Sequence, residues 1–183
     1  MPTTTTGGLP IGTAAPAFDL PDPKGRRHAL KDFAQSQALL VIFMCNHCPY
    51  VKHLKKALVY FANKYQARGL ATVAINANDW SRYAEDSPQK MQVDIETFGY
   101  PFPYLVDESQ AVSKAYGAVC TPDFFGFNAQ LALQYRGRLD ASRKESVPAA
   151  RRELFEAMLQ VAQTGQGPRE QVPSMGCSIK WKE

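Results

Sequence analysis

The chain has 183 residues, of which 45% are hydrophobic and 21% are charged, and its net charge is +4. This length suits one domain with a full hydrophobic core. The basic residues are scattered and no apolar run is long enough to span a bilayer, so we expect the protein to bind neither nucleic acid nor a membrane.

The N-terminal part of the chain predicts an arm followed by a hairpin. Residues 1–11 are rich in threonine and predict a flexible arm, and residues 12–183 predict a single domain. The arm lacks the charged and apolar regions of a signal peptide, so we expect a cytoplasmic protein whose thiols are mostly reduced. Residues 15–20 alternate apolar and polar side chains, and after the turn residues 21–25 the chain returns over residues 26–30 as the partner of a β-hairpin.

The central part of the chain predicts alternating strands and helices. An apolar run over residues 38–44 reads as a buried strand, and a helical pattern follows from Pro49 to about Tyr65. Further strands are predicted over residues 70–76 and 100–107, a polar loop over 78–88, helices over 89–98, 109–116 and 148–163, and a late hairpin over 123–127 and 131–136. This order predicts an α/β fold in which helices flank a central mixed β-sheet on both faces.

Cys45 and Cys48 lie at the junction between the buried strand and the first helix. A Cys-x-x-Cys motif in this context is typical of a thioredoxin-like redox centre. Unpaired backbone N–H groups and the helix dipole favour a thiolate at the N-terminus of a helix.

Three other interpretations of the motif are a zinc site, a structural disulfide and a pair of inert buried thiols. Zinc could use Cys45, Cys48, His47 and His53, but no second Cys/His pair follows downstream, so we expect no metal. A structural disulfide is rare in a reducing compartment. The start of a helix that begins with proline is expected to be exposed to solvent, and this favours a redox function over a pair of buried thiols.

Four segments of the sequence resemble the thioredoxin superfamily and, within it, the redoxin branch of alkyl hydroperoxide reductase and thiol-specific antioxidant (AhpC/TSA) proteins. These segments are residues 12–20, 45–52, 121–122 and 176–181. The chain is most similar to the peroxiredoxin-like family that keeps a thioredoxin-type CxxC motif. The resemblance covers roughly residues 12 to 181, and it implies a thioredoxin-like fold with an N-terminal β-hairpin and a C-terminal tail extension.

The resemblance also implies roles for Thr121 and Pro122. Pro122 would be the cis-proline that faces the motif, and Thr121 would pair with the extended chain of a substrate. The sequence departs from peroxiredoxins in the Pro-x-x-x-Thr/Ser-x-x-Cys motif, because Cys45 stands where the Thr/Ser would be and no proline precedes it. The arginine of peroxiredoxins is also missing, which favours dithiol chemistry.

We therefore predict a thiol–disulfide oxidoreductase in which Cys45 attacks and Cys48 resolves the mixed disulfide. Its only redox group would be the Cys45–Cys48 disulfide, with no further cofactor. Its partners would be a protein disulfide or a small thiol or peroxide, and an external thiol reductant. One alternative is a peroxidase in which Cys48 is peroxidatic and Cys45 resolving; another is a non-enzymatic redox sensor or metal-binding module.

Three auxiliary residues complete the prediction. His47 could stabilise a thiolate and make the disulfide more oxidising. Cys120 is either a third exchanging thiol or a buried strand residue, and Cys177 is either a resolving thiol or a packing residue. The apolar tail around Trp181 predicts that the C-terminus folds back onto the domain.

Overall fold

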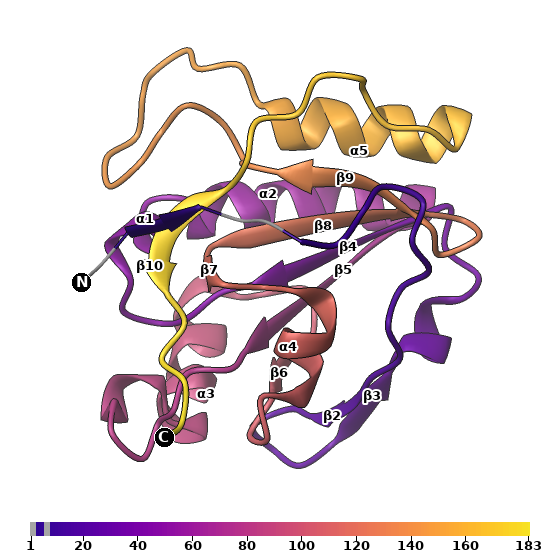
Figure 1. Cartoon of the computed structure of the whole chain (residues 1–183). Coiled ribbons are helices and arrows are strands. Elements are labelled where there is room, and N and C mark those ends of the chain that lie inside the picture. The colour runs from indigo at the N-terminus through magenta and orange to yellow at the C-terminus, as the bar shows by residue number, and fades with distance from the viewer. Residues whose placement is uncertain (1–2, 6–7) are drawn as a thin grey trace.

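The computed structural model describes residues 3–5 and 8–183, and its centre is a five-stranded mixed sheet (Figure 1). The strand order is β6-β5-β4-β8-β9, in which β4, β5 and β6 are parallel and β8 and β9 are antiparallel to their neighbours. The strands are β4 Ala38–Phe43, β5 Leu70–Asn76, β6 Tyr104–Val106, β8 Asp123–Asn128 and β9 Leu133–Gly137.

Strand β4 is central because every one of its side chains is apolar and buried. Side chains alternate between the faces of a sheet, so Leu40 and Ile42 enter one hydrophobic cluster while Leu39 and Val41 enter the other. The strand thus separates two cores, and its carboxyl end opens directly into the Cys-x-x-Cys segment.

Helices cover both faces of the sheet, which confirms the predicted α/β class. Three helices bury apolar side chains in the first cluster: α2 Lys55–Tyr65, α3 Pro88–Phe98 and α5 Glu153–Thr164. The second cluster is closed by α4 Ala111–Tyr116 and by the predicted hairpin, β2 Asp19–Pro21 with β3 Arg27–Ala29. Short 3₁₀ turns are η1 Leu30–Phe33, η2 Gln66–Arg68 and η3 Ala84–Asp86.

The predicted helix from Pro49 to Tyr65 is wrong in one respect, because it is broken into α1 (Pro49–Lys52) and α2. In a continuous helix the N–H of His53 would bond to the carbonyl of Pro49. Here that carbonyl lies 3.4 Å from the ring Nδ1 of His53, while the N–H of His53 turns toward Val51. The side chain thus competes with the backbone at the break.

The last helix begins five residues later than we predicted from Pro148. Ala149 has a φ of 61°, which lies outside the helical region. Arg152 has a ψ of 74° and its guanidinium pairs with the buried carboxylate of Asp140. The segment before Glu153 is therefore held in a non-helical path.

A second, three-stranded sheet is formed by β1 (Thr3–Thr5), β10 (Met175–Ser178) and β7 (Cys120–Thr121). Strand β10 lies between the other two and is antiparallel to both. The arm expected over residues 1–11 includes β1, and its residues 1, 2, 6 and 7 lie outside the described residues. The tail, which we expected to fold back, buries Ile179 and partly buries Trp181 against the second cluster.

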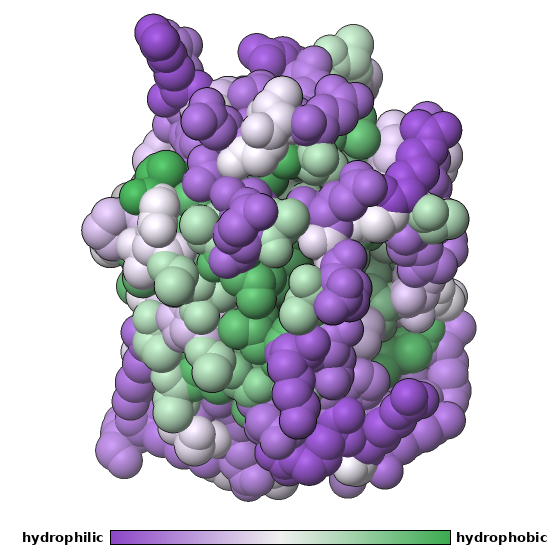
Figure 2. Space-filling model, turned by 90° about the vertical axis from the view of Figure 1, so that its right-hand side faces the viewer, coloured by the Kyte–Doolittle hydropathy of each residue, from purple (hydrophilic) through white to green (hydrophobic). Residues whose placement is uncertain are grey.

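The candidate site lies where α1 and β10 meet, at the left of Figure 1. Figure 2 shows the opposite side, where an apolar area (green) is framed by hydrophilic residues (purple). Across residues 3–5 and 8–183, no helix is both long and apolar enough to cross a membrane.

Candidate active site

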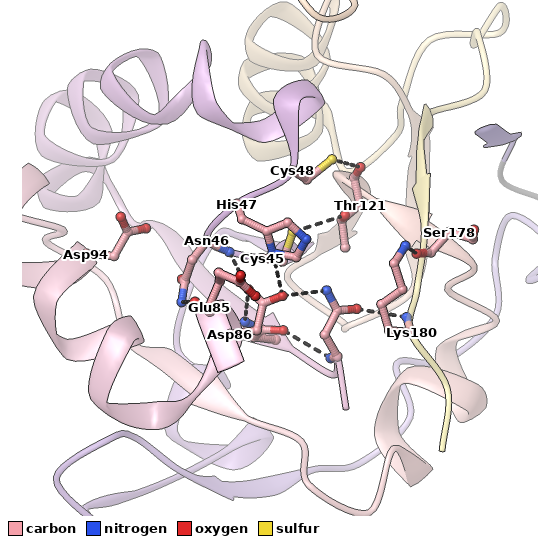
Figure 3. A network of polar contacts seen from close by, with 12 residues as sticks. Cys45, Asn46, His47, Cys48, Glu85, Asp86, Asp94, Thr121, Ser178 and Lys180 are labelled. Atoms are coloured by element: carbon pink, nitrogen blue, oxygen red, sulfur yellow. Dashed lines mark hydrogen bonds and ion pairs between the residues drawn. The ribbon is translucent and has the colours of Figure 1, made fainter. Parts of the chain in front are cut away.

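Both cysteines of the motif lie at the carboxyl end of β4 (Figure 3). Cys45 follows the strand by two residues, and Cys48 is the N-cap of α1, whose first residue is Pro49. Proline suits this position because the first N–H groups of a helix have no intrahelical partner. The side chains are 1% and 0% exposed, so the expectation that the motif is exposed is wrong. They are buried because Thr121 and β10 lie over them.

Thr121 contacts both thiols, and the peptide bond between Thr121 and Pro122 is cis, as predicted. Thr121 Oγ1 lies 3.5 Å from Cys45 Sγ. The carbonyl oxygen of Thr121 accepts a hydrogen bond of 3.4 Å from the protonated Cys48 thiol. Residues 45–48 and 121–122 are thus brought together across more than seventy positions of sequence.

The surroundings of Cys48 favour its thiolate. The pKa of Cys48 is lowered to about 5, first by a hydrogen bond from the Cys45 thiol and then by the thiol and the backbone N–H of Cys177 and by Thr121. These donors outweigh burial, which opposes ionisation. The position at the N-cap of α1 acts in the same direction.

The surroundings of Cys45 favour its neutral thiol. Its pKa is raised well above the usual value because it donates a hydrogen bond to Cys48, because it is buried, and because the Asp86 carboxylate is close. The first helical turn also begins after Cys48 rather than after Cys45. We predicted Cys45 as the attacking thiol, whereas the opposite pKa shifts and the N-cap position favour Cys48 for that role.

Asp86 is a site residue that the sequence reasoning missed, because it lies in the segment 78–88 that we interpreted as a plain polar loop. Its carboxylate is 1% exposed and lies 2.7 Å from Nδ1 of His47. It accepts hydrogen bonds of 2.8 Å from the N–H of Asn46 and 2.9 Å from the amide of Asn78 (Figure 3). The available signal was a run of asparagine and aspartate directly after a buried parallel strand.

The ion pair between His47 and Asp86 shifts the pKa of both groups. The pKa of His47 is raised, mainly by its hydrogen bond with Asp86. Burial opposes ionisation of Asp86, but the hydrogen bonds from His47, Asn78 and Asn46 outweigh it and lower the pKa of the carboxyl. His47 therefore pairs with Asp86, and its influence on Cys48 is a charge interaction through space.

One group of three side chains within the described residues has the composition of a metal site: Cys45, His47 and Asp86, whose ligand atoms lie within 4.8 Å of one another. The zinc set considered from the sequence also contained Cys48 and His53, and neither belongs to this group. Three ligands are fewer than a structural zinc uses. Both oxygens of Asp86 already accept hydrogen bonds from Asn46 and Asn78.

The two other cysteines lie on the second sheet. Cys177 on β10 pairs in register with Thr121, and its thiol donates a hydrogen bond to Cys48. Burial and this hydrogen bond raise the pKa of Cys177 to about 12. Cys120 on β7 directs its thiol to the carbonyl of Pro122 at 3.7 Å, and burial raises its pKa. Only Cys177 of these two contacts the motif through its side chain in the described structure.

A pocket of about 280 Å³ lies beside Pro122. Its apolar wall includes Tyr50, Leu54, Phe124 and Leu139, all of which are buried. Lys144 lies over the ring of Tyr50 at 5.8 Å from its centroid. The pocket therefore combines an apolar wall with a charged part of its lining, Arg138, Asp140 and Arg143, next to the α1 end of the motif.

Comparisons with known proteins identify the family of the chain and its fold. The model of the AhpC/TSA family matches residues 11–140. Among named relatives, the thiol-disulfide oxidoreductase ResA of Geobacillus thermodenitrificans is 29% identical over 123 residues, which cover 63% of this chain and 62% of that protein. A protein of Mycobacterium tuberculosis that carries the name peroxiredoxin is 28% identical over 129 residues, 69% of this chain and 76% of its own length.

Solved structures show the fold at two levels of similarity. The crystal structure of an uncharacterised conserved protein from Geobacillus kaustophilus is 45% identical, with a TM-score of 0.93, and covers 100% of this chain and 97% of its own. The thioredoxin domain of a thiol-disulfide oxidoreductase from Bacteroides vulgatus is 19% identical, with a TM-score of 0.61. The match covers 74% of this chain and 91% of that domain. The fold is thioredoxin-like, as the resemblance implied.

Proposed function

This chain belongs to the AhpC/TSA family, and we propose that it is a thiol–disulfide oxidoreductase whose redox group is the Cys45–Cys48 pair. The observation that carries the proposal is the opposite electrostatic bias of two thiols in contact, with the pKa of Cys48 lowered and that of Cys45 raised. Such a pair supplies one attacking thiolate and one protonated resolving thiol.

In the first step the Cys48 thiolate attacks one sulfur of a substrate disulfide. A mixed disulfide forms between Cys48 and that sulfur, and the second substrate sulfur leaves as a thiolate. The donors around Cys48 keep its thiolate populated at neutral pH.

In the second step Cys45 loses its proton and attacks Cys48 Sγ, which closes the Cys45–Cys48 disulfide and releases the substrate as a thiol. Two electrons pass from the pair of cysteines to the substrate disulfide. The proton of Cys45 passes to the departing substrate sulfur, which leaves as a thiol, while the nearby Asp86 carboxylate keeps Cys45 protonated until this step. An external thiol reductant then restores the dithiol.

We assign substrate docking to the surface around Pro122 and the adjacent apolar pocket. The pocket adjoins Tyr50, two residues beyond Cys48, so an apolar segment seated there would bring its sulfur toward the motif. Both thiols are buried in the free protein, so docking has to open the cover over them. The substrate class is a protein disulfide or a small disulfide, and we expect the reaction in the cytoplasm without a further cofactor.

A second candidate function is thiol-dependent peroxidase activity at Cys48. It is favoured by one observation, the lowered pKa of Cys48 at a helix N-terminus, which a peroxidatic cysteine also needs. In this case Cys48 would be oxidised to sulfenic acid and Cys45 would resolve it. The residues that orient a peroxide in peroxiredoxins are absent from the sequence, which ranks this function second.

Single-turnover reactions of the cysteine variants test both functions. With an aromatic disulfide that releases a coloured thiolate, Cys45→Ser should retain a stoichiometric burst and Cys48→Ser should lose it. Insulin reduction and hydrogen peroxide consumption are measured in parallel on the unmodified protein. A burst that survives in Cys48→Ser and disappears in Cys45→Ser would refute the assignment, and peroxide consumption without insulin reduction would select the peroxidase.

A further inference from the structure

The C-terminal strand β10 covers the edge on which we had expected a substrate to dock. The register pairs Cys177 with Thr121, the residue that precedes the cis-proline. A bound substrate would place an extended segment against this edge, with its cysteine over the attacking thiol. Strand β10 already provides an extended segment at that place, and its cysteine contacts Cys48.

The contact between Cys177 and Cys48 involves two groups of Cys177. Its thiol and its backbone N–H both hydrogen bond to Cys48 Sγ. The helix α1 and the strand β10 approach each other closely, with Cα atoms within 8 Å (Figure 1). Cys48 Sγ therefore lies between two thiols, Cys45 from its own loop and Cys177 from the tail.

Gly176, the residue before Cys177, shows how closely the backbone of β10 packs against Thr121. A Cβ atom at Gly176 would lie 1.9 Å from the carbonyl oxygen of Thr121, which no side chain tolerates. The same carbonyl accepts the hydrogen bond from Cys48. A glycine next to Cys177 is thus what allows the tail to approach the motif.

We propose that β10 is an internal substrate of the site and that Cys177 is its third redox thiol. The proposal rests on the proposed function, because it needs an attacking thiolate at Cys48. It assigns Cys48 two alternative intramolecular disulfides, Cys45–Cys48 and Cys48–Cys177. The second would link α1 covalently to the tail.

Formation of the Cys48–Cys177 disulfide needs no oxidant other than the substrate disulfide. A substrate disulfide first forms a mixed disulfide with Cys48 and loses one thiolate. Cys177 then loses its proton to the departing sulfur, attacks Cys48 Sγ and releases the second substrate sulfur as a thiol, which leaves the Cys48–Cys177 disulfide. Attack of the Cys45 thiolate on Cys48 Sγ converts this bond into the Cys45–Cys48 disulfide and returns Cys177 to the thiol form.

Tryptic peptides separate the two disulfides. Cys45 and Cys48 share the peptide 32–52, whereas Cys177 lies in the peptide 170–180. The protein is treated with oxidised glutathione, free thiols are alkylated, and the digest is analysed by mass spectrometry. In Cys45→Ser we expect the two peptides to be cross-linked.

The matched comparison is Cys45→Ser against Cys45→Ser/Cys177→Ser. The glutathione mixed disulfide should decay at least about tenfold faster when Cys177 is present, because an intramolecular thiol acts at a millimolar or higher effective concentration. Cys45→Ser/Cys120→Ser is the control and should behave like Cys45→Ser, since the Cys120 thiol points to Pro122. Circular dichroism verifies that each variant is folded, and Cys177→Ser with an intact motif supplies a second comparison.

Failure of this inference differs from failure of the proposed function. If the unmodified protein forms the Cys45–Cys48 disulfide but the mixed disulfide is equally long-lived with and without Cys177, only the inference is overturned. In the unmodified protein we also expect cross-linked peptides 32–52 and 170–180 beside the internal disulfide, and this product should disappear in Cys177→Ser. If neither intramolecular disulfide nor a mixed disulfide forms, the proposed function itself is refuted.

Discussion

At the scale of single residues, the neighbouring thiols of Cys48 and Cys45 have pKa values that are shifted in opposite directions. Cys48 receives hydrogen bonds at the N-cap of α1, while Cys45 donates one and lies near the carboxylate of Asp86. In the proposed mechanism the order of their ionisation, rather than their exposure, therefore decides which thiol attacks first.

The order of ionisation predicts the pH dependence of alkylation. Iodoacetamide labelling of Cys48 should rise with a midpoint near its pKa of about 5, whereas Cys45 should remain unlabelled until well above the usual cysteine range. Isotope-coded labelling followed by fragmentation of the peptide 32–52 measures both rates in one sample. Labelling of Cys45 at lower pH than Cys48 would reinstate Cys45 as the attacking thiol.

The Asp86 carboxylate raises the pKa of both Cys45 and His47, so Asp86→Asn should change these two pKa values and the stability of the protein. Without the carboxylate the pKa of Cys45 and that of His47 should both fall, because Asp86 raises each of them. The free energy of unfolding should drop by about 1–3 kcal/mol, since buried hydrogen-bonding groups lose their acceptor. Glu85→Gln, at the exposed neighbouring carboxylate, is the control and should leave the pKa of Cys45 unchanged within error. An unchanged Cys45 titration in Asp86→Asn would show that the carboxylate does not act on the thiol.

At the scale of elements, the pair of His47 and Asp86 ties the Cys-x-x-Cys loop to η3. The pKa of His47 is raised in the folded state, so its contribution to stability is complete below its unfolded pKa of roughly 6.5 and is lost as the pH rises through the folded value. The pKa of Asp86 is lowered, so its contribution is complete above roughly 3.9 and is lost as the pH falls through the folded value.

The pair therefore stabilises the protein most between these two limits, in mildly acidic solution. The difference in urea midpoint between the unmodified protein and His47→Gln should be largest near pH 5 to 6 and should shrink as the pH rises above the folded pKa of His47. A difference that stays constant from pH 5 to 9 would mean that His47 contributes by packing alone.

The close approach of β10 to Thr121 predicts that one methyl group added at Gly176 destabilises the protein. Gly176→Ala should displace the strand, because the added Cβ would meet the Thr121 carbonyl at 1.9 Å. Overpacking of this kind costs about 1–3 kcal/mol of unfolding free energy. Trp181 should then become more accessible to iodide, because the tail carries it onto the second core cluster. The control is Val172→Ala, at a residue that is 42% exposed just before β10, and it should change neither quantity. Full iodide protection in Gly176→Ala would contradict this account of β10.

At the scale of the whole molecule, the sequence predicted what local patterns encode. The strands β4 and β5, the late hairpin and the helices on both faces follow from apolar runs and turn residues, and the cis peptide bond at Pro122 followed from the family resemblance. The broken first helix was missed, because the competition of His53 for the Pro49 carbonyl depends on the orientation of one side chain. The role of Asp86 and the pairing of Cys177 with Thr121 could not be predicted, because both depend on long-range contacts. The Asn46 N–H that bonds to Asp86 lies 40 positions away, and Thr121 lies 56 positions before Cys177.

The reduction potential belongs to the whole molecule, because it compares the folded dithiol with the folded disulfide. The donors around Cys48 stabilise its thiolate and hence the reduced state. We expect a potential above the roughly −270 mV of thioredoxin, that is, a more oxidising disulfide. Equilibration with glutathione buffers measures it. A value well below that of thioredoxin would mean that the disulfide is stabilised more than the thiolate.

The position of β10 has a consequence for biosynthesis. At about 5–20 residues per second, roughly ten seconds separate the synthesis of Cys48 from that of Cys177. During this interval the nascent chain already carries the Cys-x-x-Cys segment but lacks the N–H and the thiol that Cys177 gives to Cys48. The part of the pKa lowering that Cys177 contributes to Cys48 is therefore missing until the last strand has been synthesised.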